Sequence, residues 1–141
     1  MRVSESETRE TLAALFNAHR RRDFDGFVAL LHDDIDWIIH GPIEVFPFAG
    51  LRRGRPAVLQ ALAVMGLSYS LRSYEPDITI VEDDRAAVMA DVSLTQLATG
   101  RLLRFRAANL IRVAGGKVIE FREFADSFDQ AEQALGRLIE L

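Results

Sequence analysis

Hydrophobic residues in the first half of the chain recur with helical spacing. In residues 5–22 the apolar positions follow i, i+3, i+4 and i+7, which predicts a helix with one buried face. That face consists of Leu12, Leu15, Phe16 and His19. A second helix is predicted in "RDFDGFVALLHDD", capped by Asp23 and with Leu31 on its apolar side. Arg55 and Pro56 open a third helix, which is expected to end at Gly66.

Period-two alternation dominates the second half and predicts strands. The segments are residues 68–74 with 77–81, then 86–97, 102–113 and 117–125. The connections "EDDR", "ATGR" and "AGGK" are short, so the later strands should pair antiparallel as a meander. "IDWIIHGP" predicts a short earlier strand, and "EVFPFAGLRRG" an aromatic loop. Ser127 and Gln130 form a capping box for a last helix.

The order of these elements predicts the fold class. Helices come first and the sheet follows, without βαβ alternation, which is typical of an α+β protein. The predicted last helix carries an apolar face of Phe128, Ala131, Leu135, Leu138 and Ile139. A chain of 141 residues is the size of one domain, and we expect residues 1–141 to form a single one.

Composition narrows the function classes. The 49% hydrophobic content indicates a globular protein, and the net charge of −4 argues against nucleic acid as a partner. No apolar run is long enough to span a bilayer, so no membrane partner is expected. The absence of cysteine excludes disulfides and suits a cytoplasmic location. The three histidines form no close pair, so neither a metal site nor another cofactor is predicted.

Polar residues on apolar strand faces are the first functional signal. On the strand over residues 102–113, Asn109 falls on the more apolar side, and on the strand over 86–97, Asp91 lies on a mixed face. In the last strand, Arg122, Phe124 and Asp126 share a side. A buried polar group without a partner costs about 1–3 kcal/mol, so such residues need partners or a solvated cavity.

Three stretches together carry a family resemblance. "RRDFDGFVALLHDDIDWIIHGP", "PFAGLRRGRPAVLQAL" and "GGKVIEFREFADSFD" resemble the SnoaL-like and ketosteroid-isomerase-like proteins of the nuclear transport factor two superfamily. The resemblance implies a cone-shaped, strongly curved antiparallel sheet packed against three helices from the N-terminal half, plus a C-terminal helix, enclosing a pocket. It also implies a homodimer that packs through the sheet. It does not imply one reaction.

The resemblance also compares catalytic positions. The ketosteroid isomerase base corresponds to Ile39, next to His40, and the isomerase tyrosine to Leu15, so that machinery is missing. The second oxyanion-hole acid of those isomerases falls near Asn109. Asp91 and Asp126 occupy the positions of the two acids of limonene-epoxide hydrolases, although Met89 replaces their arginine. The water-holding pair of those hydrolases falls near Trp37 and Ile39. In SnoaL-like cyclases the acid at the end of the last strand carries the proton, as Asp126 would here.

Each candidate has an alternative role. Asp126 could cap the following helix or, with a pKa raised by an apolar pocket, act as an acid. Asp91 could form a salt bridge with Arg104, Arg106 or Arg122, or share acid and base work with Asp126. His40 could be a neutral base near pH 7, whereas strand parity places it opposite Trp37 and Ile39 and favours a surface position. His19 is expected to be a core histidine.

Two functions remain open at this point. The first is a cofactor-free acid/base enzyme, a cyclase, isomerase or hydratase/epoxide hydrolase, acting on an apolar carbonyl or epoxide compound. The second is a non-catalytic module that binds an apolar ligand or a partner. The predicted catalytic residues are Asp126, Asp91 and His40. The predicted substrate-binding residues are Trp37, Ile39, Phe48, Met65, Met89, Asn109 and Phe124. The arginines at 20–22 and 52–55 form either a solvated face or an attraction for an anionic ligand.

Overall fold

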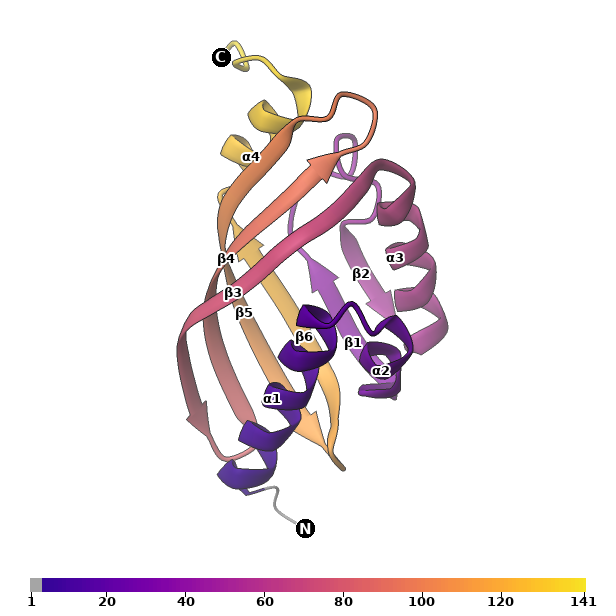
Figure 1. Cartoon of the computed structure of the whole chain (residues 1–141), viewed down its shortest axis with the longest axis vertical. Coiled ribbons are helices and arrows are strands. Elements are labelled where there is room, and N and C mark those ends of the chain that lie inside the picture. The colour runs from indigo at the N-terminus through magenta and orange to yellow at the C-terminus, as the bar shows by residue number, and fades with distance from the viewer. Residues whose placement is uncertain (1–3) are drawn as a thin grey trace.

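The protein folds as one curved sheet with helices along it. A computed structural model describes residues 4–141. The elements are α1 (Glu5–Arg20), α2 (Phe24–Ala29), β1 (Leu31–Ile39), β2 (Gly50–Arg53), α3 (Arg55–Ser68), β3 (Tyr69–Glu82), β4 (Arg85–Gln96), β5 (Leu102–Ala114), β6 (Lys117–Ala125) and α4 (Ser127–Leu135). Figure 1 shows α1, α2 and α3 on one side of the sheet, and α4 at the far end of the long strands. This arrangement confirms the α+β class that the order of elements predicts and the cone that the family resemblance implies.

The strand order is β2-β1-β6-β5-β4-β3. From β3 to β6 every neighbouring pair is antiparallel, as the short turns predict. The pairing of β1 with β6 is parallel, which corrects the expectation of a wholly antiparallel sheet. The first and last strands are separated by most of the chain, so no hairpin fixes their relative direction.

The boundary between α2 and β1 differs from the prediction. Leu31 is not on a helix; it is the first residue of β1, where it pairs with Val118 and is fully buried. The backbone N–H of Val118 donates to Leu30 O at 2.7 Å, so hydrogen bonding between strands begins at this point of the chain. The helix α2 is therefore only six residues long. Leu31 satisfies both the helical and the strand pattern, and tertiary pairing decides between them.

Two further segments depart from the prediction. Part of the expected aromatic loop forms β2, which pairs with β1. The two predicted segments before Val81 are one strand, β3, because register shifts around Leu71/Ser73 and Pro76/Ile78 accommodate the irregular positions. Proline is tolerated here because β3 is the last strand in the sheet order.

The last helix begins one residue earlier than the capping box suggests. Asp126, not Ser127, is its N-cap. The helix ends at Leu135, and Gly136 follows with φ of 70°, the left-handed conformation that glycine adopts readily. Ala131 and Ala134 form its buried face, whereas Leu138 lies beyond the helix and is 80% exposed.

The inner face of the sheet carries the core. Along β4, the alternation predicted from the sequence is confirmed. Its buried residues are Ala86, Val88, Ala90, Val92 and Leu94. One cluster of buried residues packs β1, β5 and β6 against α1, and a second surrounds Phe46, Phe48 and Tyr69. Within residues 4–141, no helix has the length and apolar character needed to cross a membrane.

The fully buried Ile35 at the centre of β1 tests this core. We expect Ile35→Ala to lower the free energy of unfolding by about 2–5 kcal/mol, because it removes buried methyl groups and leaves a cavity. Ile43, 59% exposed in the following loop, is the matched control, and Ile43→Ala should change stability by less than about 0.5 kcal/mol. Urea unfolding measures both, and equal losses would contradict the assignment of the core.

Candidate functional site

An apolar cavity lies between the inner face of the sheet and the helices. Its volume is about 130 Å³. Apolar side chains from α1, α2, α3, β1, β5, β6 and the 41–49 loop supply most of its wall. Helix α3 contributes Leu62 and Met65, and the aromatic loop contributes Phe46 and Phe48. Few polar side chains reach it, so any charge inside is poorly solvated.

Glu123 is the only carboxylate among the residues that line this cavity in the described part of the chain. It lies on β6, directly beside Ile39 of β1 and Asn109 of β5 in the strand register. Phe121, two residues earlier, is on the same inner side and is buried. The pleat of β6 therefore aims Glu123 inward.

Asn109 joins Glu123 to Tyr74. Asn109 is 0% exposed, and its Nδ2 donates to Glu123 Oε1 at 3.2 Å. Its Oδ1 accepts from the Tyr74 hydroxyl at 2.5 Å. Both ends of the amide are thus satisfied, as a buried polar side chain requires. The prediction that Asn109 lies on the inner face is correct, but the residue sits behind the cavity wall and is not among its lining residues.

Burial shifts the titration of both partners of Asn109. Burial raises the pKa of the Glu123 carboxyl above its ordinary value, and the hydrogen bond from Asn109 offsets part of this rise. The pKa of the Tyr74 hydroxyl is also raised, first by burial and then by the nearby Glu123. Tyr74 therefore remains a hydrogen-bond donor at physiological pH, while Glu123 holds its proton more tightly than an exposed glutamate does.

His19 and Trp37 also bring polar atoms to the wall, as do His40 and Gln130. The His19 ring meets the edge of Tyr74 at 5.8 Å, and burial and then Arg22 lower the pKa of its imidazole. Trp37 is 4% exposed and stacks on Phe121 at 4.2 Å. Its Nε1–H has no hydrogen-bond partner within residues 4–141. A buried donor without a partner is an exception in folded proteins, and Trp37 is one of the residues that line the cavity.

Four of the predicted binding residues, Trp37, Ile39, Phe48 and Met65, line the cavity. His40 borders it, but the residue is exposed and its ring stacks on Phe124 at 4.2 Å. Phe124 is itself 42% exposed and does not line the cavity. The parity argument that favoured a surface position for His40 agrees with this geometry.

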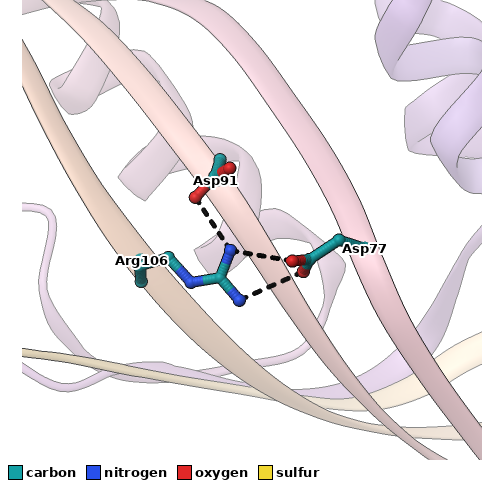
Figure 2. Close-up of polar contacts among 3 residues, drawn as sticks. All are labelled: Asp77, Asp91 and Arg106. Atoms are coloured by element: carbon teal, nitrogen blue, oxygen red, sulfur yellow. Dashed lines mark hydrogen bonds and ion pairs between the residues drawn. The ribbon is translucent and has the colours of Figure 1, made fainter.

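Asp91 points away from the cavity, contrary to the prediction of a pocket role. Figure 2 shows its carboxylate together with Asp77 around the Arg106 guanidinium. Arg106 Nη1 lies 2.9 Å from Asp91 Oδ1 and 3.0 Å from Asp77 Oδ2. Met89, two residues before Asp91, shares its outer face and also lies outside the cavity. The buried residues of β4 alternate with these two, so the pleat directs both outward.

Asp126 adopts its structural alternative. Its Oδ1 accepts from the backbone N–H of Asp129 at 3.1 Å, which caps α4. It does not line the cavity, so the structure does not bring Asp126 and Asp91 together as an acid/base pair. Asp126 and Ser127 can both cap a helix. The capping-box pattern indicated Ser127, whereas the structure uses Asp126.

Sequence reasoning missed Glu123 as a site residue and the polar role of Tyr74. The available signal was the alternation of faces along β6. If Phe121 points inward, Glu123 points inward with it; if Phe124 points inward, Asp126 does so instead. Asn109 on the apolar face of β5 was the second sign, since a buried amide needs a polar neighbour. Among the residues that the structure describes, no group of three or more potential metal ligands comes together.

The cap assignment predicts a stability effect at Asp126. Asp126→Ala should lower the free energy of unfolding by about 1 kcal/mol, because the first turn of α4 loses an acceptor. Asp126→Asn keeps an acceptor oxygen and should remain close to the unmodified protein. Chemical denaturation measures both, and a fully stable Asp126→Ala variant would contradict the cap.

Comparisons with known proteins agree with this fold. The family model of the SnoaL-like domain matches residues 12–121. A structure from Rhodopseudomonas palustris, described provisionally as an isomerase, is 36% identical with a TM-score of 0.78, over 89% of this chain and 93% of that one. A nuclear transport factor two-like protein from Burkholderia xenovorans LB400 is 27% identical with a TM-score of 0.76, over 92% and 96%.

A third similar structure is TerC, crystallised with polyporic acid, at 20% identity and a TM-score of 0.82, over 92% of this chain and 98% of TerC. Among curated proteins, no sequence matches this chain. The family match covers well over half of the 141 residues, and the curved six-stranded sheet agrees with it. The chain belongs to the SnoaL-like domain family of the nuclear transport factor two-like superfamily.

Proposed function

We propose that this protein binds a small apolar carbonyl compound in the cavity and transfers a proton with Glu123. The observation that carries the proposal is an inward-facing carboxyl in an otherwise apolar cavity, held by a fully buried amide. General acid–base catalysis is most effective when the pKa of the group lies near the working pH, and burial moves the pKa of Glu123 upward, toward neutrality.

The proposed step is proton abstraction next to a carbonyl. A Glu123 carboxylate oxygen takes a proton from the carbon beside the carbonyl, and the electron pair of that C–H bond moves to the carbonyl oxygen as an enolate. The donor that we assign to that oxygen is the Nε1–H of Trp37, which has no partner within residues 4–141. Glu123 then returns the proton to the same carbon or to a conjugated one. Return of the proton to the conjugated carbon is an isomerisation. Neither of these two outcomes needs a cofactor.

Asn109 and Tyr74 are positioning residues in this proposal. Because the Tyr74 hydroxyl donates to Asn109 Oδ1, the amide NH₂ faces Glu123. The amide then favours the ionised form of Glu123 and limits the rise of its pKa. The carboxyl is thereby kept able to act as a base as well as an acid.

The 36% identical structure described provisionally as an isomerase supports this reaction class. Isomerisation next to a carbonyl needs only the removal and return of a proton. A non-catalytic binding protein is the second candidate, and one observation favours it: the strand end that resembles the isomerase base position holds Ile39, which lines the cavity as an apolar residue. The following experiment separates the two.

Deuterium exchange into a ketone tests the proton transfer. With 2-tetralone in D₂O, we expect the protein to accelerate loss of the α-proton NMR signals, and Glu123→Gln to reduce that acceleration by about 10²-fold or more. Glu82→Gln, at an exposed position at the end of β3, is the control and should exchange as the unmodified protein does. Binding of the ketone without accelerated exchange would identify the non-catalytic candidate.

We also propose that the outer face of the sheet forms a homodimer. Exposed and half-buried apolar side chains gather there in two cross-strand rows that the register defines. One row is Ile78, Met89, Ala108 and Phe124. The other is Ile80, Ala87 and Leu110. Contiguous apolar patches of this kind mark interaction sites, and the family resemblance favours a second copy of the chain as the partner.

Light scattering tests the dimer. We expect a mass near twice the 15.8 kDa of one chain, and a shift toward the monomer for Leu110→Asp, because a carboxylate would be buried at the interface. Leu97→Asp, at an exposed position directly after β4 and outside both rows, is the control. A monomeric unmodified protein would overturn the proposal.

A further inference from the structure

A second, larger chamber adjoins the apolar cavity. Its volume is about 330 Å³, and it shares six wall residues with the inner cavity. The shared residues are His19, Phe27, Leu62, Met65, Leu71 and Tyr74. The inner cavity alone has about the size that accommodates a single benzene ring. A larger ligand would therefore extend past His19 and Tyr74 into the outer chamber.

Arginine side chains dominate the charge of this outer chamber. Arg20, Arg22 and Arg72 line it, opposed by Asp23 and Glu75. The carboxylate of Asp23 is engaged by the backbone N–H of Gly26 at 2.9 Å, and Glu75 lies 3.9 Å from Arg20. Arg22 and Arg72 make no ion pair with any residue in the range 4–141, and three arginines against two carboxylates leave the chamber with an excess of one positive charge.

Arg22 has a strained backbone conformation, and the residue lines the outer chamber. Arg22 has φ of 56°, directly after the C-cap of α1, a conformation that usually belongs to glycine. Its guanidinium donates to Leu71 O at 3.1 Å and to Arg72 O at 3.4 Å, across the start of β3. Strain of this kind persists where the surroundings demand it, and it is concentrated at functional sites.

The positive charge extends to the junction of the two chambers. After burial, Arg22 is the largest cause that lowers the pKa of His19; Glu75 opposes this shift, and Arg20 adds a smaller lowering. His19 lines both chambers. The junction is therefore a place where an anionic group on a ligand would be favoured and an additional cation disfavoured.

We propose that the ligand of this protein is an apolar compound that carries an anionic group, a carboxylate or a phosphate. Its apolar body occupies the inner cavity near Trp37, and its anionic group lies in the outer chamber between Arg22 and Arg72. Guanidinium groups suit both anions, since they donate two parallel hydrogen bonds to oxygen pairs. This inference rests on the proposed function only in that it places the ligand body beside Glu123.

Three naphthyl compounds of similar shape test the charge preference. Calorimetry would compare 2-naphthylacetate, 2-naphthyl phosphate and the neutral 2-naphthylacetamide. We expect at least one anion to bind about tenfold more tightly than the amide, as one or two partly exposed charge-assisted hydrogen bonds allow. The preference should shrink at high salt, because the arginines are exposed to solvent.

Two single substitutions test whether Arg22 and Arg72 cause the preference for an anion over the amide. Arg72→Gln should remove most of the preference and leave the affinity for the amide unchanged; Arg72 contributes only a 3.5 Å contact to Thr95, so the fold should tolerate its loss. Arg22→Gln should act in the same way, and circular dichroism will show whether its contacts to β3 are needed for folding. Arg85→Gln, exposed at the start of β4 and outside both chambers, is the matched control.

The pKa of His19 gives an independent signal. Binding of an anion should raise the pKa of the imidazole, measured by NMR titration, whereas the amide should not. Equal affinities for anions and amide, or a preference that survives Arg72→Gln and Arg22→Gln alike, would overturn the inference. Because 2-tetralone is neutral, we expect its deuterium exchange not to depend on Arg22 or Arg72. That experiment therefore tests the Glu123 proposal separately.

Discussion

A single fully buried amide organises the polar part of this protein. Asn109 sits on the inner face of β5, where its neighbours along the strand are apolar, and each end of its side chain has one partner. Removing either partner would leave a buried donor or acceptor unpaired, at a cost of about 1–3 kcal/mol. Tyr74 and Glu123 are therefore tied to each other through Asn109, although they come from β3 and β6 at opposite sides of β4 and β5.

Much of the fold could be predicted because strand alternation and short turns are local signals. The inner face of β4 and the meander from β3 to β6 follow from them. The parallel pairing of β1 with β6 could not be predicted, since it joins distant segments and no turn specifies its direction. Leu31 shows the same limit on a smaller scale: it fits a helix and a strand equally well, and only its pairing with Val118 decides between them.

The site was harder to predict because its key residue depends on which face of β6 turns inward. The pattern "EFREFAD" gives an aromatic residue on both faces, Phe121 on one and Phe124 on the other. The stacking of Phe121 on Trp37 selects its face, and with it Glu123. Asp126 was attractive as an acid by resemblance, yet it lies where the strand ends and a helix needs its first acceptor. Of the three polar strand residues Asp91, Asn109 and Asp126, only Asn109 is buried on the inner face, and a polar residue within an apolar run is visible without tertiary information.

The role proposed for Glu123 requires a desolvated carboxyl with a raised pKa. The most direct measurement is a ¹³C NMR pH titration of the protein labelled at the glutamate side-chain carboxyl carbons, with Glu123→Gln assigning the signal. We expect a midpoint for Glu123 above the value of about 4.3 that exposed glutamates show. A midpoint at or below that value would mean that the carboxyl is solvated, and it would contradict the role proposed for Glu123.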